Sequence, residues 1–283
     1  MTPRWRSLLY VPVVAERFVA KAHERGADAV ILELEDAVAP SEKDRARTLV
    51  RAAAATVAQG GVDVLVRINR PWRLAVRDIE ASVDDSVQAF VLPKVDSAEH
   101  VLALAEVTAA VEKERGLPVG HTLFFPRIEG PKALLNAGAI ADAHPRVVAI
   151  GLGSSDFTIA TGMEAGGEGN AIASFQVVVA AVAAGRLPLG LVGSITDFRD
   201  LDVFRRVAER SRALGLRGAP CVHPSQVPIL NEVFAPTDDE VERARRVVEK
   251  YEQALAAGEG AVLVDGEFVD VPFYEQAKRL LQS

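Results

Sequence analysis

Short apolar runs alternate along the chain with stretches whose apolar residues recur at helical spacing. The apolar runs do not alternate strictly with polar residues, which is typical of parallel strands covered by helices. Eight runs are expected to be strands: Ser7–Val11, Ala29–Leu34, Val62–Ile68, Ala89–Leu92, Thr122–Ile128, Val147–Gly151, Leu189–Val192 and Gly218–Val222. Seven helical patterns separate them: Glu16–Arg25, Glu42–Gln59, Leu74–Ser86, Ala98–Arg115, Pro131–Ala141, Ala171–Ala184 and Leu201–Leu214.

Eight strands separated by helices are the number found in a TIM (β/α)8 barrel, so the chain is predicted to be an α/β barrel. A doubly wound open sheet is the alternative. Ser41 and Ser97 stand where N-caps are expected. Glycines stand where helices are expected to end: Gly26, Gly60, Gly116, Gly185 and Gly215.

The last part of the chain follows a different pattern. A helix is expected over Asp238–Ala257, then a short β-like hairpin over Ala261–Asp270, and a last helix from Phe273. We expect this extension to be too small for a core of its own. The chain is therefore divided into a barrel over residues 1–235 and an extension over 236–283, which packs on the barrel or on a neighbouring subunit.

The composition excludes some classes of protein and leaves the predicted fold unchanged. The 283 residues are 49% hydrophobic and 25% charged, as in ordinary globular proteins. Lys and Arg number 32 against 39 Asp and Glu, a net charge of −7, which argues against a binder of nucleic acid backbones. A small anionic substrate in a local cationic pocket remains compatible with this charge.

One cysteine, Cys221, permits no internal disulfide, and a reducing, cytoplasmic compartment is the expectation. The five histidines show no metal-ligand spacing. The apolar start resembles a signal peptide, but Pro12 interrupts it, and we expect a mature first strand there. The charge-free run Gly169–Gly185 is too short and too polar for a membrane span, so it is expected to be a buried helix.

Polar residues close several of the predicted strands. In a barrel, the carboxyl ends of all strands meet at the face that carries the active site. The candidates at this face are Glu35, Asp36, Arg67, Asn69, Lys94, Arg127, Glu129, Asp156 and His223.

Glu129 and Asp156 follow neighbouring strands, so their carboxylates can meet over the barrel mouth. Two carboxylates without a His or Cys companion suit a hard cation, Mg²⁺ or Mn²⁺, completed by water and substrate oxygens. The alternative is that each carboxylate forms a salt bridge or caps the following helix.

Arg67 ends an apolar strand, where a guanidinium needs an anion beside it. That anion is either a substrate or a structural partner such as Glu35 or Asp36. Lys94 has the same two interpretations, and a third as a Schiff-base nucleophile.

Three further motifs have a functional and a structural interpretation. Gly151–Asp156 lacks the third glycine of a dinucleotide loop, and its aspartate would repel phosphate. Glu164–Asn170 is interpreted as a lid or loop. Cys221 and His223 share a strand face and could form a dyad, but a core thiol beside a site histidine is the favoured interpretation.

Together, the ordered motifs are similar to those of the citrate lyase β-subunit-like proteins of the HpcH/HpaI aldolase superfamily, relatives of malyl-CoA and citramalyl-CoA lyases. The resemblance runs from Arg6 to about Leu280. Its motifs are Arg6–Pro12, Leu34–Val38, Val66–Asn69, Leu92–Lys94, Ile128-Glu129, Gly153–Asp156, Asp197–Asp200, His223–Gln226, Val264–Gly266 and Val269-Asp270.

This resemblance implies a TIM barrel that assembles as a homotrimer or hexamer. It implies Mg²⁺-dependent, reversible carbon–carbon cleavage of 3-hydroxyacyl thioesters of coenzyme A into a 2-oxo acid and an acyl-thioester enolate. Nucleic acid and membrane are not implied as partners. Glu129 and Asp156 then correspond to the metal ligands and Arg67 to the substrate-orienting cation.

The remaining site residues also follow from the resemblance or from their place at the strand ends. Glu35 and Asp36 correspond to carboxylates that support the site. Asp270 corresponds to an aspartate that reaches a neighbouring subunit's site as acid/base. Lys94 and His223 are candidates for substrate binding.

The chain departs from the family pattern at Val13-Val14, at Glu33, at Val192–Ile195 and at Gly167–Asn170. These positions concern substrate and thioester binding more than the metal ligands. Two alternatives therefore stay open: an aldolase that acts on a free 2-oxo acid without coenzyme A, and a non-catalytic homologue that serves as a binding subunit.

Overall fold

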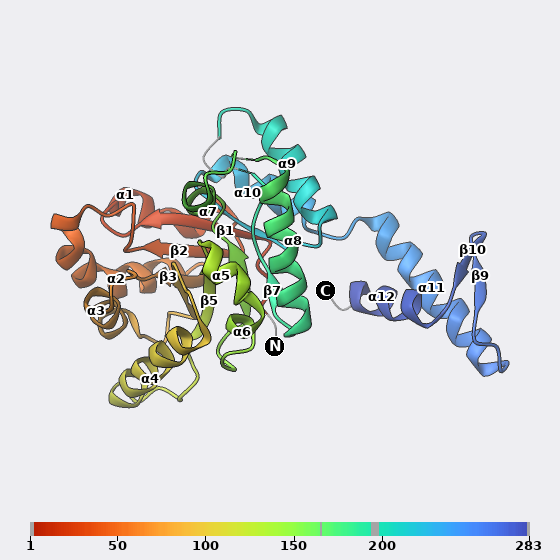
Figure 1. Ribbon diagram of the computed structural model, residues 1–283, viewed down its shortest axis with the longest axis horizontal. Helices are drawn as coiled ribbons and strands as arrows, with labels where there is room; N and C mark the ends of the chain where they lie inside the picture. The colour runs from red at the N-terminus through yellow and green to blue at the C-terminus, as the bar shows by residue number, and fades with distance from the viewer. Residues whose placement is uncertain (1–2, 165, 194–197, 282–283) are drawn as a thin grey trace. The chain divides into compact units, whose positions relative to one another are not determined.

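The computed structural model describes residues 3–164, 166–193 and 198–281. Its main sheet contains eight parallel strands, which lie in the order β7-β6-β5-β4-β3-β2-β1-β8 (Figure 1). The strands are β1 (Ser7–Pro12), β2 (Ala29–Glu33), β3 (Asp63–Arg67), β4 (Ala89–Leu92), β5 (Leu123–Ile128), β6 (Ala149–Leu152), β7 (Leu187–Pro188) and β8 (Ala219–Cys221). From β1 to β7 neighbours in the sheet are neighbours in sequence, and β8 pairs with β1, whereas a doubly wound sheet reverses its order at a switch point.

Backbone hydrogen bonds close the gap between the two end strands. The amide of Arg217 donates to the carbonyl of Pro188, and the amide of Gly190 donates to the carbonyl of Gly218, both at 2.9 Å. The sheet is therefore a barrel, and the predicted TIM-barrel fold is confirmed.

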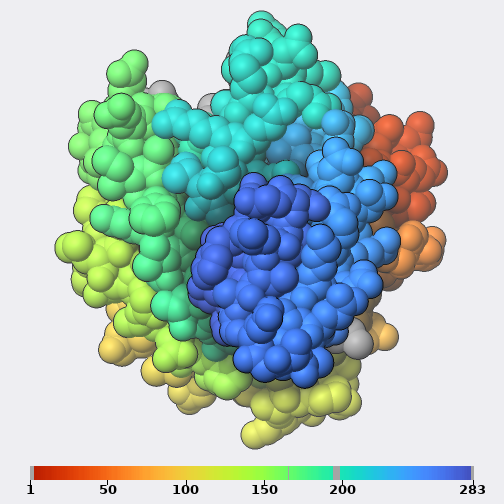
Figure 2. Space-filling model, turned by 90° about the vertical axis from the view of Figure 1, so that its right-hand side faces the viewer, coloured from red at the N-terminus to blue at the C-terminus, as the bar shows by residue number. Residues whose placement is uncertain are grey.

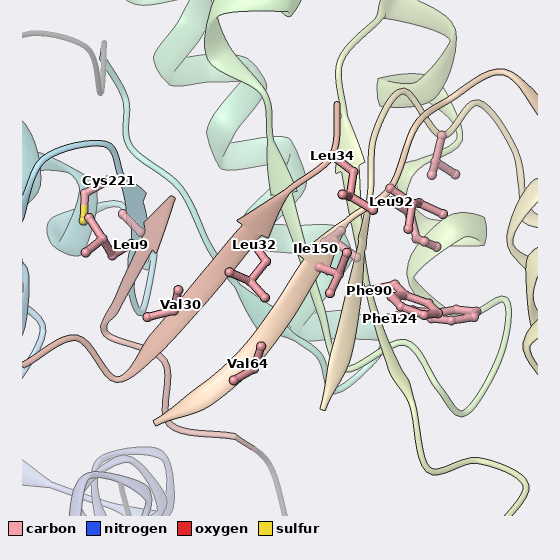
Figure 3. Packing of buried hydrophobic residues seen from close by; sticks show 14 of the residues in the cluster. Leu9, Val30, Leu32, Leu34, Val64, Phe90, Leu92, Phe124, Ile150 and Cys221 are labelled. Atoms are coloured by element: carbon pink, nitrogen blue, oxygen red, sulfur yellow. The ribbon is translucent and has the colours of Figure 1, made fainter. Parts of the chain in front are cut away.

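Two apolar clusters lie on opposite faces of the sheet. The outer cluster joins strand residues such as Leu9, Val30 and Leu32 to helix residues, and Figure 3 shows these three on adjacent strands. The inner cluster contains no helix residue and includes Leu8 and Ile31, one position away from members of the outer cluster. Because successive strand residues point to opposite faces, the inner cluster fills the interior of the barrel.

The helices surround the sheet. They are α1 (Glu16–Val19), α2 (Lys43–Ala58), α3 (Trp72–Ser82), α4 (Ala98–Glu114), α5 (Pro131–Leu135), α6 (Ala137–Ala141), α7 (Ser154–Thr161), α8 (Glu168–Ala183), α9 (Leu201–Ala213) and α10 (Val227–Val233). Short 3₁₀ helices lie at η1 (Ala22–Arg25), η2 (Pro40–Glu42) and η3 (Pro224–Gln226).

Several predicted helix boundaries were wrong. The pattern over Glu16–Arg25 is split between α1 and η1, and α7 and α10 were not predicted. Ser41 lies inside η2 and caps no α-helix, and at the end of α2 it is Gly61, not Gly60, that has a positive φ. Gly26, Gly116, Gly185 and Gly215 do have positive φ values, as expected of residues that end helices.

The chain divides into two compact units, Met1–Phe234 and Ala235–Ser283. The second contains α11 (Asp238–Ala256), the antiparallel strands β9 (Val262–Val264) and β10 (Glu267–Val269), and α12 (Val271–Leu281). Thr237 and Glu240 form a capping box at the start of α11.

This second unit was expected to lack a core of its own, and that expectation was wrong. Its helices and hairpin bury one small cluster, and Figure 2 shows the unit's atoms, in blue, packed together. The cluster consists of Ala244, Val247, Tyr251, Val264, Val269 and Ala277. Among the described residues, no helix is long and apolar enough to cross a membrane.

Candidate active site

A cavity of about 380 Å³ opens at the carboxyl ends of the barrel strands. Its charged and phenolic lining comes from five strands or the loops that follow them. These residues are Tyr10, Glu33, Asp36, Arg67, Arg127, Glu129 and Asp156. The cavity therefore brings together five of the residues predicted at this face: Asp36, Arg67, Arg127, Glu129 and Asp156.

The strand pleat explains why these side chains enter the cavity. Leu65 and Phe125 belong to the inner apolar cluster, and Arg67 and Arg127 follow them by two positions on β3 and β5. Residues two apart on a strand share a face, so the arginines lie one layer further along the barrel interior. A polar layer thus covers the apolar interior and forms the floor of the cavity.

Glu129 lies just beyond β5 and is 6% exposed. Burial raises the pKa of its carboxyl to about 7, with Arg127 opposing and Glu35 and Asp156 adding to the shift. Its Oε2 atom is buried and has no hydrogen-bond partner among the described residues. A buried carboxylate oxygen without a partner is costly, unless a cation or a proton occupies the position beside it.

Asp156 is the third residue of α7 and lines the same cavity as Glu129. The turn that precedes α7 is closely packed against Glu129, since a Cβ atom on Gly153 would lie 2.4 Å from the Cγ of Glu129. Two carboxylates, one with an unpartnered oxygen, fit a hard divalent cation. Among the described residues, no group of three or more His, Cys, Asp or Glu side chains could hold a metal, so water and substrate would have to complete its coordination.

Arg67 is held by two carboxylates. Its Nε atom donates to Oε2 of Glu33 at 2.5 Å, and its Nη1 atom lies 3.1 Å from Oε2 of Glu35. Its guanidinium also lies 4.9 Å from the ring centroid of Tyr10. Burial opposes the charge, but Tyr10, Glu33 and Glu35 outweigh this effect and raise the pKa of Arg67. The structural partner considered for Arg67 is thus Glu35, joined by Glu33, and the cation is fixed in one orientation.

Lys94 pairs with the same carboxylate as Arg67. Its Nζ atom donates to Oε1 of Glu35 at 2.7 Å and lies 3.6 Å from Oδ2 of Asp36. Burial lowers the pKa of Lys94, but the hydrogen bond to Glu35 and the neighbouring carboxylates reverse this effect, and the net shift is upward. The amine stays protonated near neutral pH, which argues against Lys94 as a Schiff-base nucleophile.

The loop that carries Glu35 is anchored from behind. Asn69 donates to the carbonyl of Leu34 at 2.9 Å, and Lys43 donates to the carbonyls of Leu34 and Glu35. Asn69 is held in turn by the buried carboxylate of Asp78, at 2.7 Å. Asn69, one of the polar strand-end residues, therefore acts on the loop and not on the cavity.

His223 does not line the cavity. Its ring stacks on Phe198 at 4.9 Å, and its Nδ1 atom accepts a hydrogen bond from the amide of Ser225 at the start of η3. Cys221 is buried in the outer cluster, and burial raises the pKa of its thiol to about 12. The structure therefore supports a core thiol over a Cys–His dyad, and a substrate role for His223 stays a prediction.

Asp270 belongs to the second unit and precedes α12. Its carbonyl accepts the amide of Tyr274, and its Oδ1 atom is buried without a hydrogen-bond partner among the described residues. Its predicted role in another subunit's site stays a prediction.

The departures from the family pattern have distinct places in the structure. Val13 is buried, and Gly193 lines the cavity, whereas Ser194 and Ile195 lie outside the described residues. The segment expected to be a lid or loop is in part helical, because α8 begins at Glu168.

Tyr10 was not among the predicted site residues, Arg127 was predicted at this face without a role, and Glu33 was treated only as a departure. The period of two along each strand is the signal that could have found them. On β2, the inward position of Ile31 predicts inward positions for Glu33 and Glu35, and β1 and β5 follow the same rule.

Comparison with known proteins places this geometry in a family. Residues 6–224 match the HpcH/HpaI aldolase/citrate lyase family. Citrate lyase subunit beta of Leuconostoc mesenteroides subsp. cremoris is 34% identical over 280 residues, which cover 98% of this chain and 92% of that protein. L-malyl-CoA/beta-methylmalyl-CoA lyase of Cereibacter sphaeroides is 34% identical over 297 residues, with 96% of this chain and 91% of that protein covered.

A solved structure supports the same relationship. The protein CitE from Mycobacterium tuberculosis, in complex with magnesium, acetoacetate and coenzyme A, has a TM-score of 0.75 and 25% identity, and the match covers 100% of this chain and 98% of that chain. The two sequence relatives are carbon–carbon lyases by name, which confirms the predicted enzyme class. The chain belongs to the HpcH/HpaI aldolase/citrate lyase family.

Proposed function

We propose that the protein is a Mg²⁺-dependent lyase that cleaves or forms a 3-hydroxyacyl thioester of coenzyme A, of the citryl-, malyl- or citramalyl-CoA type. The observation that carries this proposal is the unpartnered buried Oε2 atom of Glu129, in one cavity with Asp156 and Arg67. The solved complex of a relative with magnesium and coenzyme A supports it.

Glu129 and Asp156 would hold the ion, and water and substrate oxygens would fill its remaining positions. The bound ion would act as a Lewis acid toward the carbonyl and carboxylate of the 2-oxo acid. Mn²⁺ has the same ligand preference and would serve as the alternative ion.

Arg67 supplies a fixed positive charge for the substrate oxygen on which negative charge develops. Glu33 and Glu35 hold this guanidinium before the substrate arrives, so no reorganisation is needed during the reaction. Lys94 neutralises part of the charge on Glu35, which leaves Arg67 more available to the substrate.

The reaction balances as a reversible retro-aldol step. The 3-hydroxyl gives its proton to the acid/base carboxylate, which returns it in the next step, the adjacent carbon–carbon bond breaks to leave the 2-oxo acid, and the electron pair of that bond passes to the thioester enolate. The enolate then takes a proton at its α-carbon. We assign this proton transfer to Asp270 of a neighbouring copy in a homotrimer or hexamer, on the basis of the family resemblance.

The test measures 2-oxo acid released from malyl-CoA and citryl-CoA, with and without Mg²⁺. We expect Glu129→Gln and Asp156→Asn each to lower turnover by about a hundredfold or more, because a neutral amide binds the ion poorly. Glu106→Gln, on the exposed face of α4, is the control and should be unchanged.

Free malate tested in parallel distinguishes an aldolase that does not need coenzyme A. Cleavage of free malate at the rate of malyl-CoA would favour that alternative. Calorimetry with Mg²⁺ and pyruvate tests the binding-subunit alternative, which the absence of any heat would favour. Full activity of both carboxamide variants would overturn the assignment of the metal site.

A further inference from the structure

Arg127 differs from the other well-buried arginines in its partners. Arg146 pairs with Glu112 at 2.5 Å, Arg47 pairs with Asp78 at 2.6 Å, and Arg67 is held by two carboxylates. Arg127 is 8% exposed and forms no ion pair within the part of the chain that the structure describes.

The hydrogen bonds of Arg127 leave one end of its guanidinium unused. Its Nη2 atom donates to the carbonyl of Leu152 at 2.8 Å, and the guanidinium lies 5.2 Å from the ring centroid of Phe125. Its Nη1 atom is buried and has no hydrogen-bond partner among the described residues. A buried cation in this state is strongly unfavourable unless an anion joins it.

The position of Arg127 indicates where that anion would bind. Arg127 lines the same cavity as Glu129 and Asp156, and it lies on β5, two residues before Glu129, so it lies deeper in the barrel. The backbone of Gly151 packs closely against the guanidinium, since a Cβ atom there would lie 3.0 Å from Nη1.

We propose that Arg127 is a specificity-determining residue that binds a second carboxylate on the 2-oxo acid portion of the substrate. This inference rests on the proposed function. There, the metal ion and Arg67 bind the first carboxylate and the oxygen next to it, and the long thioester arm has to leave through the open mouth. The deeper, unpaired guanidinium of Arg127 then fits a further carboxylate at the buried end of the substrate. This contact would select dicarboxylic over monocarboxylic 2-oxo acids. A bidentate arginine–carboxylate pair supplies both the affinity and the direction of this contact.

Calorimetry with malate and lactate in saturating Mg²⁺ tests the proposal. These two 2-hydroxy acids differ by one carboxylate and, unlike oxaloacetate, do not decarboxylate. We expect the wild-type protein to bind malate at least about tenfold more tightly than lactate, which corresponds to about 1.4 kcal/mol. Arg127→Leu should remove this preference and leave lactate affinity within about twofold, while Arg127→Lys should keep part of it.

Arg186→Leu is the matched control, because Arg186 also donates to a single backbone carbonyl, that of Ala141, but precedes β7 at the opposite end of the barrel. It should keep the malate preference. If Arg127→Leu does not fold, the ratio of malate affinity to lactate affinity in Arg127→Gln tests the proposal by the same criterion.

Three results would overturn the proposal. They are a wild-type protein without preference for malate, an Arg127→Leu or Arg127→Gln variant that keeps the full preference, and an equal loss of malate and lactate affinity with weaker Mg²⁺ binding. The last would show that Arg127 acts only through Glu129. Wild-type protein that binds neither acid in the presence of Mg²⁺ would overturn the proposed function as well, so the two failures are distinguishable.

Discussion

At the scale of single residues, the charge state of each acid in the cavity follows from its partners. Glu35 is buried, which raises the pKa of its carboxyl. Arg67 and Lys94 both form ion pairs with this carboxylate and offset much of that rise. Glu129 is equally buried and has no ion-pair partner within 4 Å in the described part of the chain. It is therefore the carboxylate whose pKa rises to about 7, and the one that gains most from a bound cation.

The raised pKa of Glu129 predicts an unusual dependence of stability on pH in the metal-free protein. The folded state holds this proton up to about pH 7, whereas the unfolded state releases it near the ordinary value of 4.5. The stabilising contribution is therefore present below about pH 4.5 and is lost as the pH rises through 7. The loss is on the order of 3 kcal/mol relative to Glu129→Gln, which does not titrate.

Chemical denaturation of both proteins between pH 5 and pH 8, without metal, measures this difference. Saturating Mg²⁺ at pH 8 should restore stability to the wild-type protein and not to Glu129→Gln. Parallel pH profiles of the two proteins would contradict the prediction.

At the scale of elements, the turn between β6 and α7 sets the position of the metal-binding carboxylates. It carries Asp156 into the first turn of α7, and its backbone at Gly153 packs directly on the side chain of Glu129. The glycine is needed for this contact and not for its backbone conformation, since its φ of −84° is accessible to other residues.

Gly153→Ala is therefore predicted to displace Glu129. The added Cβ atom would lie 2.4 Å from Cγ of Glu129, so the side chain has to move. We expect Mg²⁺ affinity, measured by calorimetry, to fall by about tenfold or more, and stability to fall by about 1–3 kcal/mol.

Gly130→Ala is the neighbouring control. A Cβ atom there meets nothing within 4 Å, and the φ of −146° is ordinary. Both properties should stay close to wild type, with stability within about 0.5 kcal/mol. Equal effects of the two substitutions would show that the contact with Glu129 is not what matters.

Element prediction succeeded where a segment spans several buried positions. Seven of the eight strands overlap their predicted ranges, because each is a buried apolar run, whereas the predicted strand Leu189–Val192 begins just after the two-residue β7 (Leu187–Pro188). Shorter segments such as α7 and α10 were missed, since one or two turns carry too little of the helical period to be recognised. Their formation depends on the neighbours that bury Phe157 and Leu230.

At the scale of the whole molecule, each of the two units has an apolar core of its own. The metal-binding candidates all belong to Met1–Phe234, whereas Asp270 belongs to Ala235–Ser283. Binding and proton transfer are thus assigned to different units, and a truncation can separate them.

A protein that ends at Phe234 is predicted to unfold cooperatively and to bind Mg²⁺ and malate, but to lose turnover of the thioester. Asp270→Asn in the full chain should reproduce the loss of turnover without loss of binding, because it removes only the proton-transfer group. Turnover by the truncated protein at the full-length rate would show that Asp270 is not the acid/base.

The sequence by itself determined the barrel, because the number of apolar runs and their order limit how the strands can be buried. It also determined that Arg67, Glu129 and Asp156 would meet, because the carboxyl ends of parallel strands share one face. The family resemblance, read from the ordered motifs, was confirmed.

Only the tertiary structure decided which charges neutralise one another. Arg67 and Arg127 both end predicted strands, and no local pattern showed which of them is paired, but Arg67 lies between two carboxylates and Arg127 has none among the described residues. Likewise, a polar strand-end residue such as His223 does not enter the cavity, whereas Glu33 does. Pairing depends on side-chain directions and distances between strands far apart in sequence, and no local pattern of residues encodes those distances.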